Sequence, residues 1–244
     1  MSKEILEKLR NDQDYYGAFG KQYMSNSDIG TLLTNPKEYG VSLPDNANFA
    51  KGRYFHQLIL EPEKAVGYTF VESSSRNTKL YKEYCAEADV KFALLFKEGE
   101  ELRALVDVMM GNLDMYDLIR NPKNAYEVPA IAEIKGVKWK GKADIVHPDM
   151  VIDLKTTSKI EDFKWSARKY NYDSQCYIYQ KLFGKPLIFI VIDKTNNMMG
   201  IFRPTEEFVK RGEEKVEKAI AVYHKFFGSN PTSDIDTFYY DEFL

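Results

Sequence analysis

One stretch of the sequence, residues 141–157, restricts the fold and chemistry of this chain more than any other. It consists of two apolar segments joined by a Pro-Asp pair, a pattern typical of two strands connected by a tight turn. Each segment carries one aspartate, Asp144 in the first and Asp153 in the second. An ionised carboxylate in a half-buried strand is costly unless a cation or hydrogen bonds compensate it. The pattern therefore predicts a site at which the two acids act together.

The turn predicts how the two aspartates lie relative to each other. If Pro148 and Asp149 form a two-residue turn, Asp144 faces Asp153 across the hairpin, with Cβ atoms about 5 Å apart. Lys155 follows Asp153 by two positions and points to the same face of its strand. Two acids and a lysine on one face of a strand pair are typical of metal-dependent hydrolysis.

A third acid is predicted from the segment that precedes this hairpin. Two further strand segments can pair through a turn at Lys135 and Gly136, which places Glu127 opposite Asp144. Glu133 is the competing candidate, but in this register it lies beside the turn, about 20 Å from the aspartates at the rise of a strand. We therefore favour Glu127, although a register shift of one residue would move it to the other face.

The pattern as a whole predicts an α/β fold with a central mixed sheet flanked by helices, preceded by a mainly helical N-terminal portion. Apolar residues that recur every three to four positions, together with start and stop signals, predict the helices. We expect helices at residues 27–39, 49–60, 78–96, 98–120, 162–183 and 205–227. Further strands are expected at residues 68–71, 187–193 and 198–203.

The length of 244 residues fits a single domain that spans residues 1–244. Within it we expect a helical N-terminal portion (1–120), a catalytic core (121–227) and a tail (228–244). Residues 1–20 are charged and then rich in Tyr and Gly, which predicts a short helix and a loose surface arm.

The distribution of charge limits how the chain can bind nucleic acid. The net charge is −3, so a nucleic acid must meet a local basic surface. Alternation along one strand puts three lysines on one face, and this face is either solvated or in contact with phosphates. The expected helix at 162–183 adds basic and aromatic side chains, a combination that suits phosphate contact and base stacking. These residues are Lys138, Lys140 and Lys142 on the strand, and Trp165, Arg168, Lys169, Tyr170 and Tyr172 on the helix.

The cysteine content and the absence of long apolar runs indicate the compartment. Cys85 and Cys176 are the only cysteines and are most simply free thiols in a reducing cytosol. No apolar run approaches the ~20 residues of a membrane span, and the first ten residues lack an apolar signal region. We therefore expect a cytoplasmic protein without a membrane partner.

Taken together, these residues resemble the PD-(D/E)XK nuclease superfamily. Asp144 followed by Asp153-Leu154-Lys155 is similar to the superfamily signature, and residues 152–157 resemble the I-D-hydrophobic-K-T strand of its RecB-like branch. Gln175 and Tyr179 match the Q-x-x-x-Y motif of that branch, and residues 52–62, which include His56, resemble its upstream histidine motif. Residues 24–39 are similar to the opening of phage and prophage exonucleases of the exodeoxyribonuclease VIII type.

The resemblance implies a role for each residue of the site. Asp144, Asp153 and the Leu154 carbonyl would hold Mg²⁺ or Mn²⁺, and Glu127 and His56 would complete that site or support a second ion. Lys155 would orient or deprotonate the attacking water. Gln175 and Tyr179 would brace the DNA strand or the helix that carries them.

The resemblance also implies an activity, namely metal-dependent exonuclease action on linear duplex DNA or its ends. Such an enzyme would serve phage-type recombination with a single-strand annealing protein, and it would assemble into a homo-oligomer. An endonuclease or a DNA-binding module of the same fold is the main alternative. A phosphatase acting on small substrates and a purely structural protein with buried acids are further alternatives.

Overall fold

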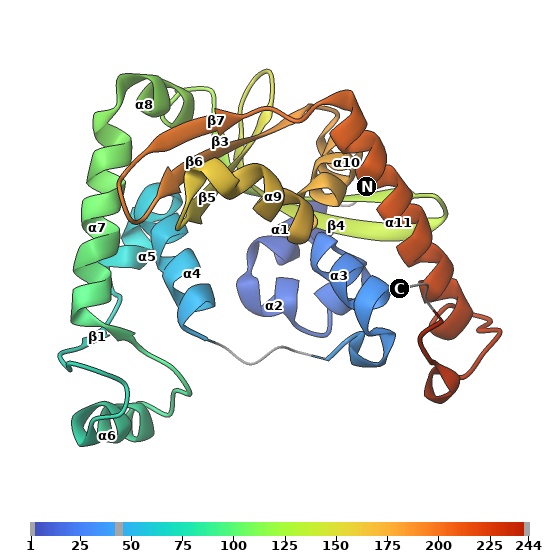
Figure 1. The fold of residues 1–244 in the computed structure, drawn as a ribbon, viewed down its shortest axis with the longest axis horizontal. Helices are drawn as coiled ribbons and strands as arrows, with labels where there is room; N and C mark the ends of the chain where they lie inside the picture. The colour runs from blue at the N-terminus through green and yellow to red at the C-terminus, as the bar shows by residue number, and fades with distance from the viewer. Residues whose placement is uncertain (1–2, 42–45, 242–244) are drawn as a thin grey trace.

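The computed structural model describes residues 3–41 and 46–241. Its centre is a five-stranded sheet with the order β3-β4-β5-β6-β7, in which only β5 and β6 run parallel (Figure 1). The predicted α/β fold with a mixed sheet is therefore confirmed. The strands are β3 (Ala125–Ile134), β4 (Val137–Val146), β5 (Val151–Thr157), β6 (Leu187–Asp193) and β7 (Met199–Phe202).

Helices cover both faces of this sheet, because the central strands are apolar on both sides. All residues of β6 are buried, and alternate residues of the strand belong to two separate hydrophobic clusters. One cluster joins the sheet to α3 (Asn26–Thr34), α9 (Phe163–Lys169), α10 (Tyr172–Phe183) and α11 (Glu206–Phe226). The other joins it to α4 (Ala47–Leu60), α7 (Phe96–Gly111) and α8 (Leu113–Ile119).

Both tight turns predicted from the sequence are present. Lys135 and Gly136 have φ of 50° and 79°, as a two-residue hairpin turn requires, and the β3–β4 register is the predicted one. The N–H of His147 bonds the Met150 carbonyl at 2.9 Å and closes the second turn. The register next to that turn is also the predicted one, but β4 and β5 form only two residue pairs before they separate.

The N-terminal segment is not the loose arm that the sequence predicted. Within the described residues it forms α1 (Lys3–Arg10), α2 (Asp12–Tyr16) and a 3₁₀ turn at Gly20–Gln22. Leu9 and Tyr15 are buried, and Met24 bonds the free edge of β4 through the Lys138 carbonyl and the Lys140 N–H. The prediction failed because the few apolar residues of this segment find their partners only in the folded core.

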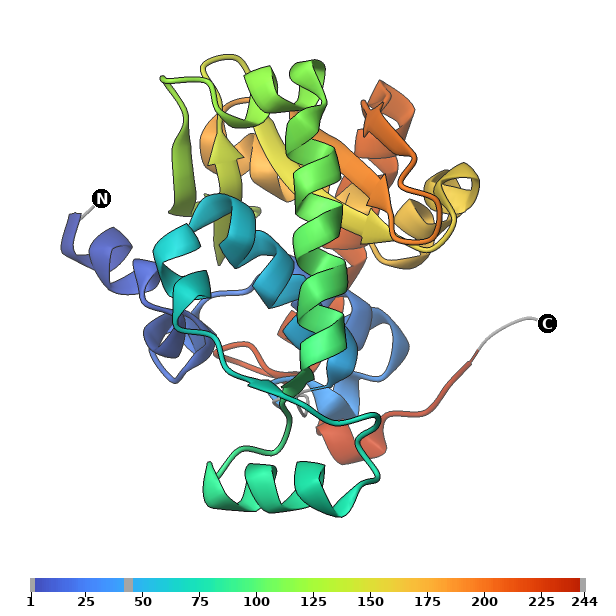
Figure 2. The ribbon, with the colours of Figure 1, turned by 90° about the vertical axis from the view of Figure 1, so that its left-hand side faces the viewer.

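Three predicted helices differ from the observed ones. The helix expected at 162–183 is interrupted at Asn171, whose φ of 57° ends α9 and starts α10 in a new direction. The helix expected at 98–120 is interrupted at Asn112, which caps α8. The helix expected at 78–96 is the short α6 (Lys79–Glu87), followed by β2 (Leu94–Leu95), which pairs with β1 (Phe70–Val71). Figure 2 shows α7 in front of the sheet and α6 extending below it.

The remaining described segments close the surface of the molecule. A short helix, α5 (Pro62–Val66), follows α4, and the tail lies against α3, where Tyr240 donates a hydrogen bond to the Thr34 carbonyl. Cys85 and Cys176 are free thiols. Across the described residues, no helix is both long enough and apolar enough to cross a membrane.

Candidate active site

The candidate site forms where β4 and β5 separate. Beyond the pair of Ile145 with Ile152, the two strands are bridged by a side chain, because Oδ2 of Asp144 accepts a hydrogen bond from the Leu154 N–H at 2.7 Å. The expected ladder pair of Asp144 with Asp153 is therefore absent. Burial raises the pKa of Asp144, and the charge of Asp153 raises it further. The two carboxylates thus act on each other across the gap between the strands.

His56 reaches the same gap from α4. Its Nε2 lies 2.9 Å from the Leu154 carbonyl oxygen and 3.6 Å from Oδ2 of Asp144. The neighbouring residues Phe55 and Ile59 are buried against the sheet and fix this helix in place. The structure therefore brings together the histidine and the acids that the sequence motifs predicted.

Asp153 is held from two sides at the centre of the site. The Gln175 amide donates to Oδ1 of Asp153 at 2.6 Å, and Nζ of Lys155 lies 2.5 Å from Oδ2. Asp153 is only 4% exposed. Burial lowers the pKa of Lys155, but the Asp153 carboxylate, Tyr172 and the Asp144 carboxylate outweigh this, so the pKa lies above its ordinary value. Lys155 is therefore protonated in this arrangement.

Tyr179 connects the helix of the site to the sheet. Its hydroxyl donates to the Lys142 carbonyl at 2.9 Å, which fastens α10 to β4. Gly141 makes this close approach possible, because a Cβ at that position would lie 2.6 Å from Cδ1 of Leu182 and 3.1 Å from Cε2 of Tyr179. Tyr179 is buried, so among its two predicted roles the contacts favour bracing the helix.

Glu127 lies at the site, whereas Glu133 does not. The register places Glu127 at the level of Asp144, but its φ of 49° interrupts the ladder between the pairs on either side. Burial and then the charge of Asp144 raise the pKa of Glu127 to about 7. Glu133 is exposed and pairs with Lys138 beside the hairpin turn, as predicted.

The lysines expected on one face of β4 are mostly neither solvated nor available to phosphates. Lys140 is buried and donates to the Tyr15 carbonyl, and burial lowers its pKa to about 8. Nζ of Lys142 forms an ion pair with Asp12 and lies 3.5 Å from Oε2 of Glu127. Only Lys138 of the three is exposed, because α1 and α2 cover the rest of the face.

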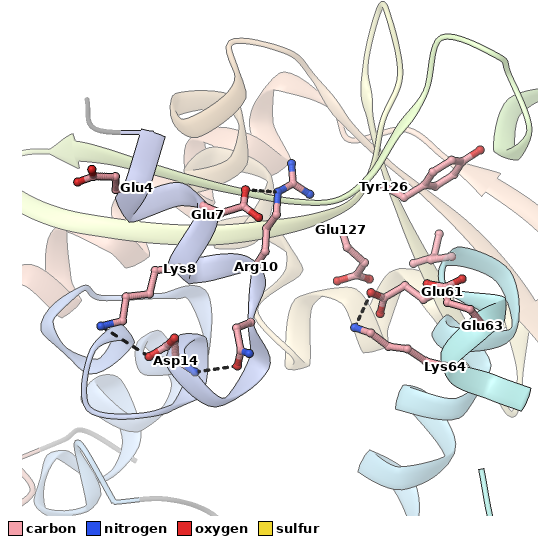
Figure 3. A pocket seen from close by; sticks show the side chains of 12 residues that line it. Glu4, Glu7, Lys8, Arg10, Asp14, Glu61, Glu63, Lys64, Tyr126 and Glu127 are labelled. Atoms are coloured by element: carbon pink, nitrogen blue, oxygen red, sulfur yellow. Dashed lines mark hydrogen bonds and ion pairs between the residues drawn. The ribbon is translucent and has the colours of Figure 1, made fainter. Parts of the chain in front are cut away.

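An open cavity of ≈ 910 Å³ separates α1 and α2 from the corner between α4 and α5, with Glu127 on its wall (Figure 3). Six acidic residues and three basic ones line it, so it disfavours phosphates. Figure 3 shows Glu61 beside Glu127, with Glu61 paired to Lys64 at 2.5 Å. The charged lining residues are Glu4, Glu7, Lys8, Arg10, Asp14, Glu61, Glu63, Lys64 and Glu127.

The residues of the site are a suitable donor set for a hard divalent cation. In the part of the chain that is described, no three His, Cys, Asp or Glu side chains are already gathered as a metal cage. The set instead combines the Asp144 and Asp153 carboxylates with the Leu154 carbonyl, and Mg²⁺ prefers such oxygen ligands together with waters. Oδ2 of Asp153 is buried, and its partner within the described residues is the Lys155 ammonium. Burial and the charge of Asp153 raise the pKa of Asp144, and a bound cation would favour its ionised form.

Two further residues lie at the site without a role predicted there from the sequence motifs. The ring of Tyr172 is 4.9 Å from Nζ of Lys155, and Asp12 of the N-terminal segment pairs with Lys142. Tyr172 precedes Gln175 by three positions, so the periodicity of the helix could have placed it on the same face. No sequence signal indicates Asp12, because its position depends on how the N-terminal segment packs.

The fold is similar to that of a solved structure with a TM-score above 0.5. A candidate exonuclease from Eubacterium rectale has 18% sequence identity and a TM-score of 0.64, covering 88% of this chain and 85% of its own. An alkaline exonuclease from Laribacter hongkongensis has 12% identity and a TM-score of 0.36, covering 85% and 91% respectively. A phage-related exonuclease from Haemophilus somnus has 16% identity and a TM-score of 0.33, covering 70% and 92%.

Comparison of sequences shows the family. No curated protein matches the chain. The sequence model of one family matches residues 35–231, which is most of the chain and includes every residue of the candidate site except Asp12. The chain therefore belongs to the family described as PDDEXK-like domain of unknown function (DUF3799).

Proposed function

We propose that this protein is a metal-dependent deoxyribonuclease that degrades linear DNA from its ends. One observation carries the proposal: His56, Asp144 and the Asp153–Lys155 pair converge where β4 and β5 separate. The protein from Eubacterium rectale that shares the fold is named as a candidate exonuclease, which supports action at DNA ends.

The acids and the carbonyl would hold the metal ion, either Mg²⁺ or Mn²⁺. Asp144, Asp153 and the Leu154 carbonyl form the central donor set, and Glu127 and His56 lie beside it. A bound divalent cation supplies charge neutralisation at the phosphate and lowers the pKa of its water. Through its hydrogen bond to Oδ1, Gln175 fixes the rotamer of Asp153, and Oδ2 stays beside the Lys155 ammonium.

Lys155 is suited to orient the attacking water rather than to deprotonate it. Its pKa is raised by Asp153, Tyr172 and Asp144, so its ammonium group has protons to donate to a water or to a phosphate oxygen. Its position over the Tyr172 ring restricts the rotamers that it can adopt. Lys155 thus contributes both orientation and positive charge where negative charge develops on the phosphate.

The test compares one plasmid in linear and covalently closed form, each with the purified protein and Mg²⁺. Linear DNA should be degraded progressively from its ends, whereas the closed circle should persist, and chelation should abolish the activity. Equal loss of both forms would replace the exonuclease assignment with an endonuclease. Hydrolysis that survives chelation, with metal content verified as nil, would refute the metal-dependent mechanism.

Substitution of Lys155 connects the activity to this site. Lys155→Ala should slow hydrolysis by about 10²–10⁴-fold, as expected for the loss of one catalytic group, while DNA binding in EDTA persists. Lys218→Ala removes the same charge from an exposed position on α11 and should leave the rate unchanged. A Lys155→Ala protein that cuts at the wild-type rate would exclude the proposed site.

The proposal extends to assembly and partners. With a net charge of −3, an open surface would bind DNA weakly, which favours a homo-oligomer that encloses DNA and concentrates positive potential. Because Lys140 and Lys142 are engaged with the N-terminal segment, Lys138, Arg168 and Lys169 remain as phosphate contacts. Phage-type recombination with a single-strand annealing protein fits this activity. Sedimentation that shows only a monomer would remove the enclosing oligomer.

A further inference from the structure

The short helix α9 presents an unusual outer surface beside the candidate site. Its inner residues Phe163 and Ala167 are buried against the sheet. Its outer residue Trp165 is 56% exposed, and Tyr170, which follows the helix, is 57% exposed. Two large aromatic rings on one small surface are costly to expose to water unless they serve a partner.

Positive charges accompany these rings. Nζ of Lys164 and Cζ of Arg168 lie 5.2 Å and 5.1 Å from the Trp165 ring, and Nζ of Lys169 lies 5.6 Å from the Tyr170 ring. Within the described residues, none of these three cations forms an ion pair with a carboxylate. The surface thus offers flat aromatic faces together with uncompensated positive charge.

The surface is connected to the candidate site by a short row of side chains. The Tyr170 ring lies 6.2 Å from the Tyr172 ring, which in turn lies 4.9 Å from Nζ of Lys155. The left-handed Asn171 between the two tyrosines lets one point outward while the other faces the site. A strand bound on α9 would therefore lie next to the reacting phosphate.

Contacts with α11 and β7 hold the outer surface of α9 in place. Lys215 on α11 donates to the Arg168 carbonyl at 3.2 Å, and the Phe163 ring packs 4.5 Å from the Phe202 ring of β7. A rigid surface loses little conformational entropy when a ligand binds to it. Figure 1 shows α9 at the front of the molecule, where no other element covers it.

We propose that this surface, defined as Lys164, Trp165, Arg168, Lys169 and Tyr170, binds unpaired nucleotides of a DNA strand beside the candidate site. The inference rests on the proposed function and names the form of DNA recognised. Exposed rings can stack on bases only where those bases are unpaired, and the cations match the phosphates. The cavity on the other side of Glu127 is acidic, so the strand approaches from the α9 side.

The first test measures binding of fluorescein-labelled oligothymidylate by anisotropy, with the full chain in EDTA so that no hydrolysis occurs. Trp165→Ala and Tyr170→Ala should each weaken binding by roughly 5- to 100-fold, the usual effect of losing one stacked base. Tyr116→Ala is the matched control, because Tyr116 is 46% exposed on the distant α8. If Trp165→Ala and Tyr170→Ala both bind as tightly as the control variant, the proposal is overturned.

The second test follows intrinsic fluorescence and separates base stacking from general attraction. The chain has two tryptophans, Trp139 is buried, and so quenching by oligothymidylate reports on Trp165. Trp165→Phe should abolish quenching and retain most of the affinity, because phenylalanine also stacks. Wild-type protein that binds without any quenching would refute stacking on Trp165.

The third test concerns the phosphates. Lys169→Gln should lower the salt dependence of the affinity by about 0.7 in the logarithmic slope, the value for one phosphate contact of a single strand. Lys218→Gln removes the same charge from an exposed position on α11 and should leave the slope unchanged. An unchanged slope for Lys169→Gln would remove that contact from the proposal.

These tests can fail independently of the proposed function. Hydrolysis of linear DNA by the wild-type protein, together with undiminished binding by Trp165→Ala, would refute this inference alone. Stacking on Trp165 without hydrolysis under any divalent metal would refute the nuclease proposal and leave the binding surface in place.

Discussion

Replacing Lys140 should change how the stability of the protein depends on pH. Lys140 is 5% exposed and lies under the N-terminal segment, where its Nζ donates to the Tyr15 carbonyl. Burial lowers its pKa from 10.5 to about 8. A difference of this size corresponds to about 3 kcal/mol of free energy between the charged and neutral forms. Lys140→Met fills a similar volume without a titratable group.

The sign of the effect follows from proton binding. Between pH 8 and pH 10.5 the unfolded chain keeps a proton on this lysine that the folded chain releases. Stability rises with pH where the unfolded state binds more protons, so this lysine adds stability as the pH increases. Between pH 7 and pH 9.5, the free energy of unfolding of the wild type should rise by about 2 kcal/mol more than that of Lys140→Met.

Urea unfolding at steps between pH 7 and pH 9.5 measures this difference. At pH 9.5 most tyrosine side chains are still protonated, and the titration of the rest cancels when the wild type is compared with Lys140→Met. Lys138→Met is the matched control on the same strand, since Lys138 is exposed, and its curve should run parallel to that of the wild type. Parallel curves for the wild type and Lys140→Met would refute the burial of a lysine beneath the N-terminal segment.

Three further predictions concern the candidate site and the packing behind it. Glu127→Gln should reduce DNA hydrolysis far more than Glu133→Gln, because only the first acid lies near the aspartates; the reverse ranking would contradict the site described here. Gln175→Leu removes the hydrogen bond that orients Asp153 and should weaken Mg²⁺ binding by about 10- to 100-fold in calorimetric titration. An unchanged affinity for Mg²⁺ would argue against this role of Gln175. Gly212→Ala places a Cβ 2.0 Å from a backbone oxygen of the facing helix, so thermal unfolding should show a loss of about 1–3 kcal/mol, and an unchanged Tm would be inconsistent with this close approach.

The sheet could be predicted because its turns are local. Lys135-Gly136 and Pro148-Asp149 each fix a register from neighbouring residues, and both registers are observed. The separation of β4 from β5 could not be predicted from the turn, since it depends on the Asp144 side chain replacing a backbone partner.

Other features depend on contacts between distant parts of the chain. The break at Asn171 lies inside a segment with helical periodicity, and distant residues, Lys215 and Asn26, hold its left-handed conformation through hydrogen bonds. The burial of Lys140 could not be predicted from its strand alone, because it depends on residues 3–24 folding back over β4. Within the site, the motifs indicated His56 and Gln175, but they could not indicate the pairing of Lys142 with Asp12.

The backbone bonds between Met24 and β4 have a consequence for where the folding unit begins. The family match starts at residue 35, so a protein shortened to that boundary would keep every residue of the candidate site except Asp12. It would also uncover the edge of β4 near Lys138, whose backbone groups could then pair with a strand of another molecule. We expect such a shortened protein to aggregate or to exchange strands. The segment that precedes residue 35 thus protects the edge of β4 from pairing with another molecule.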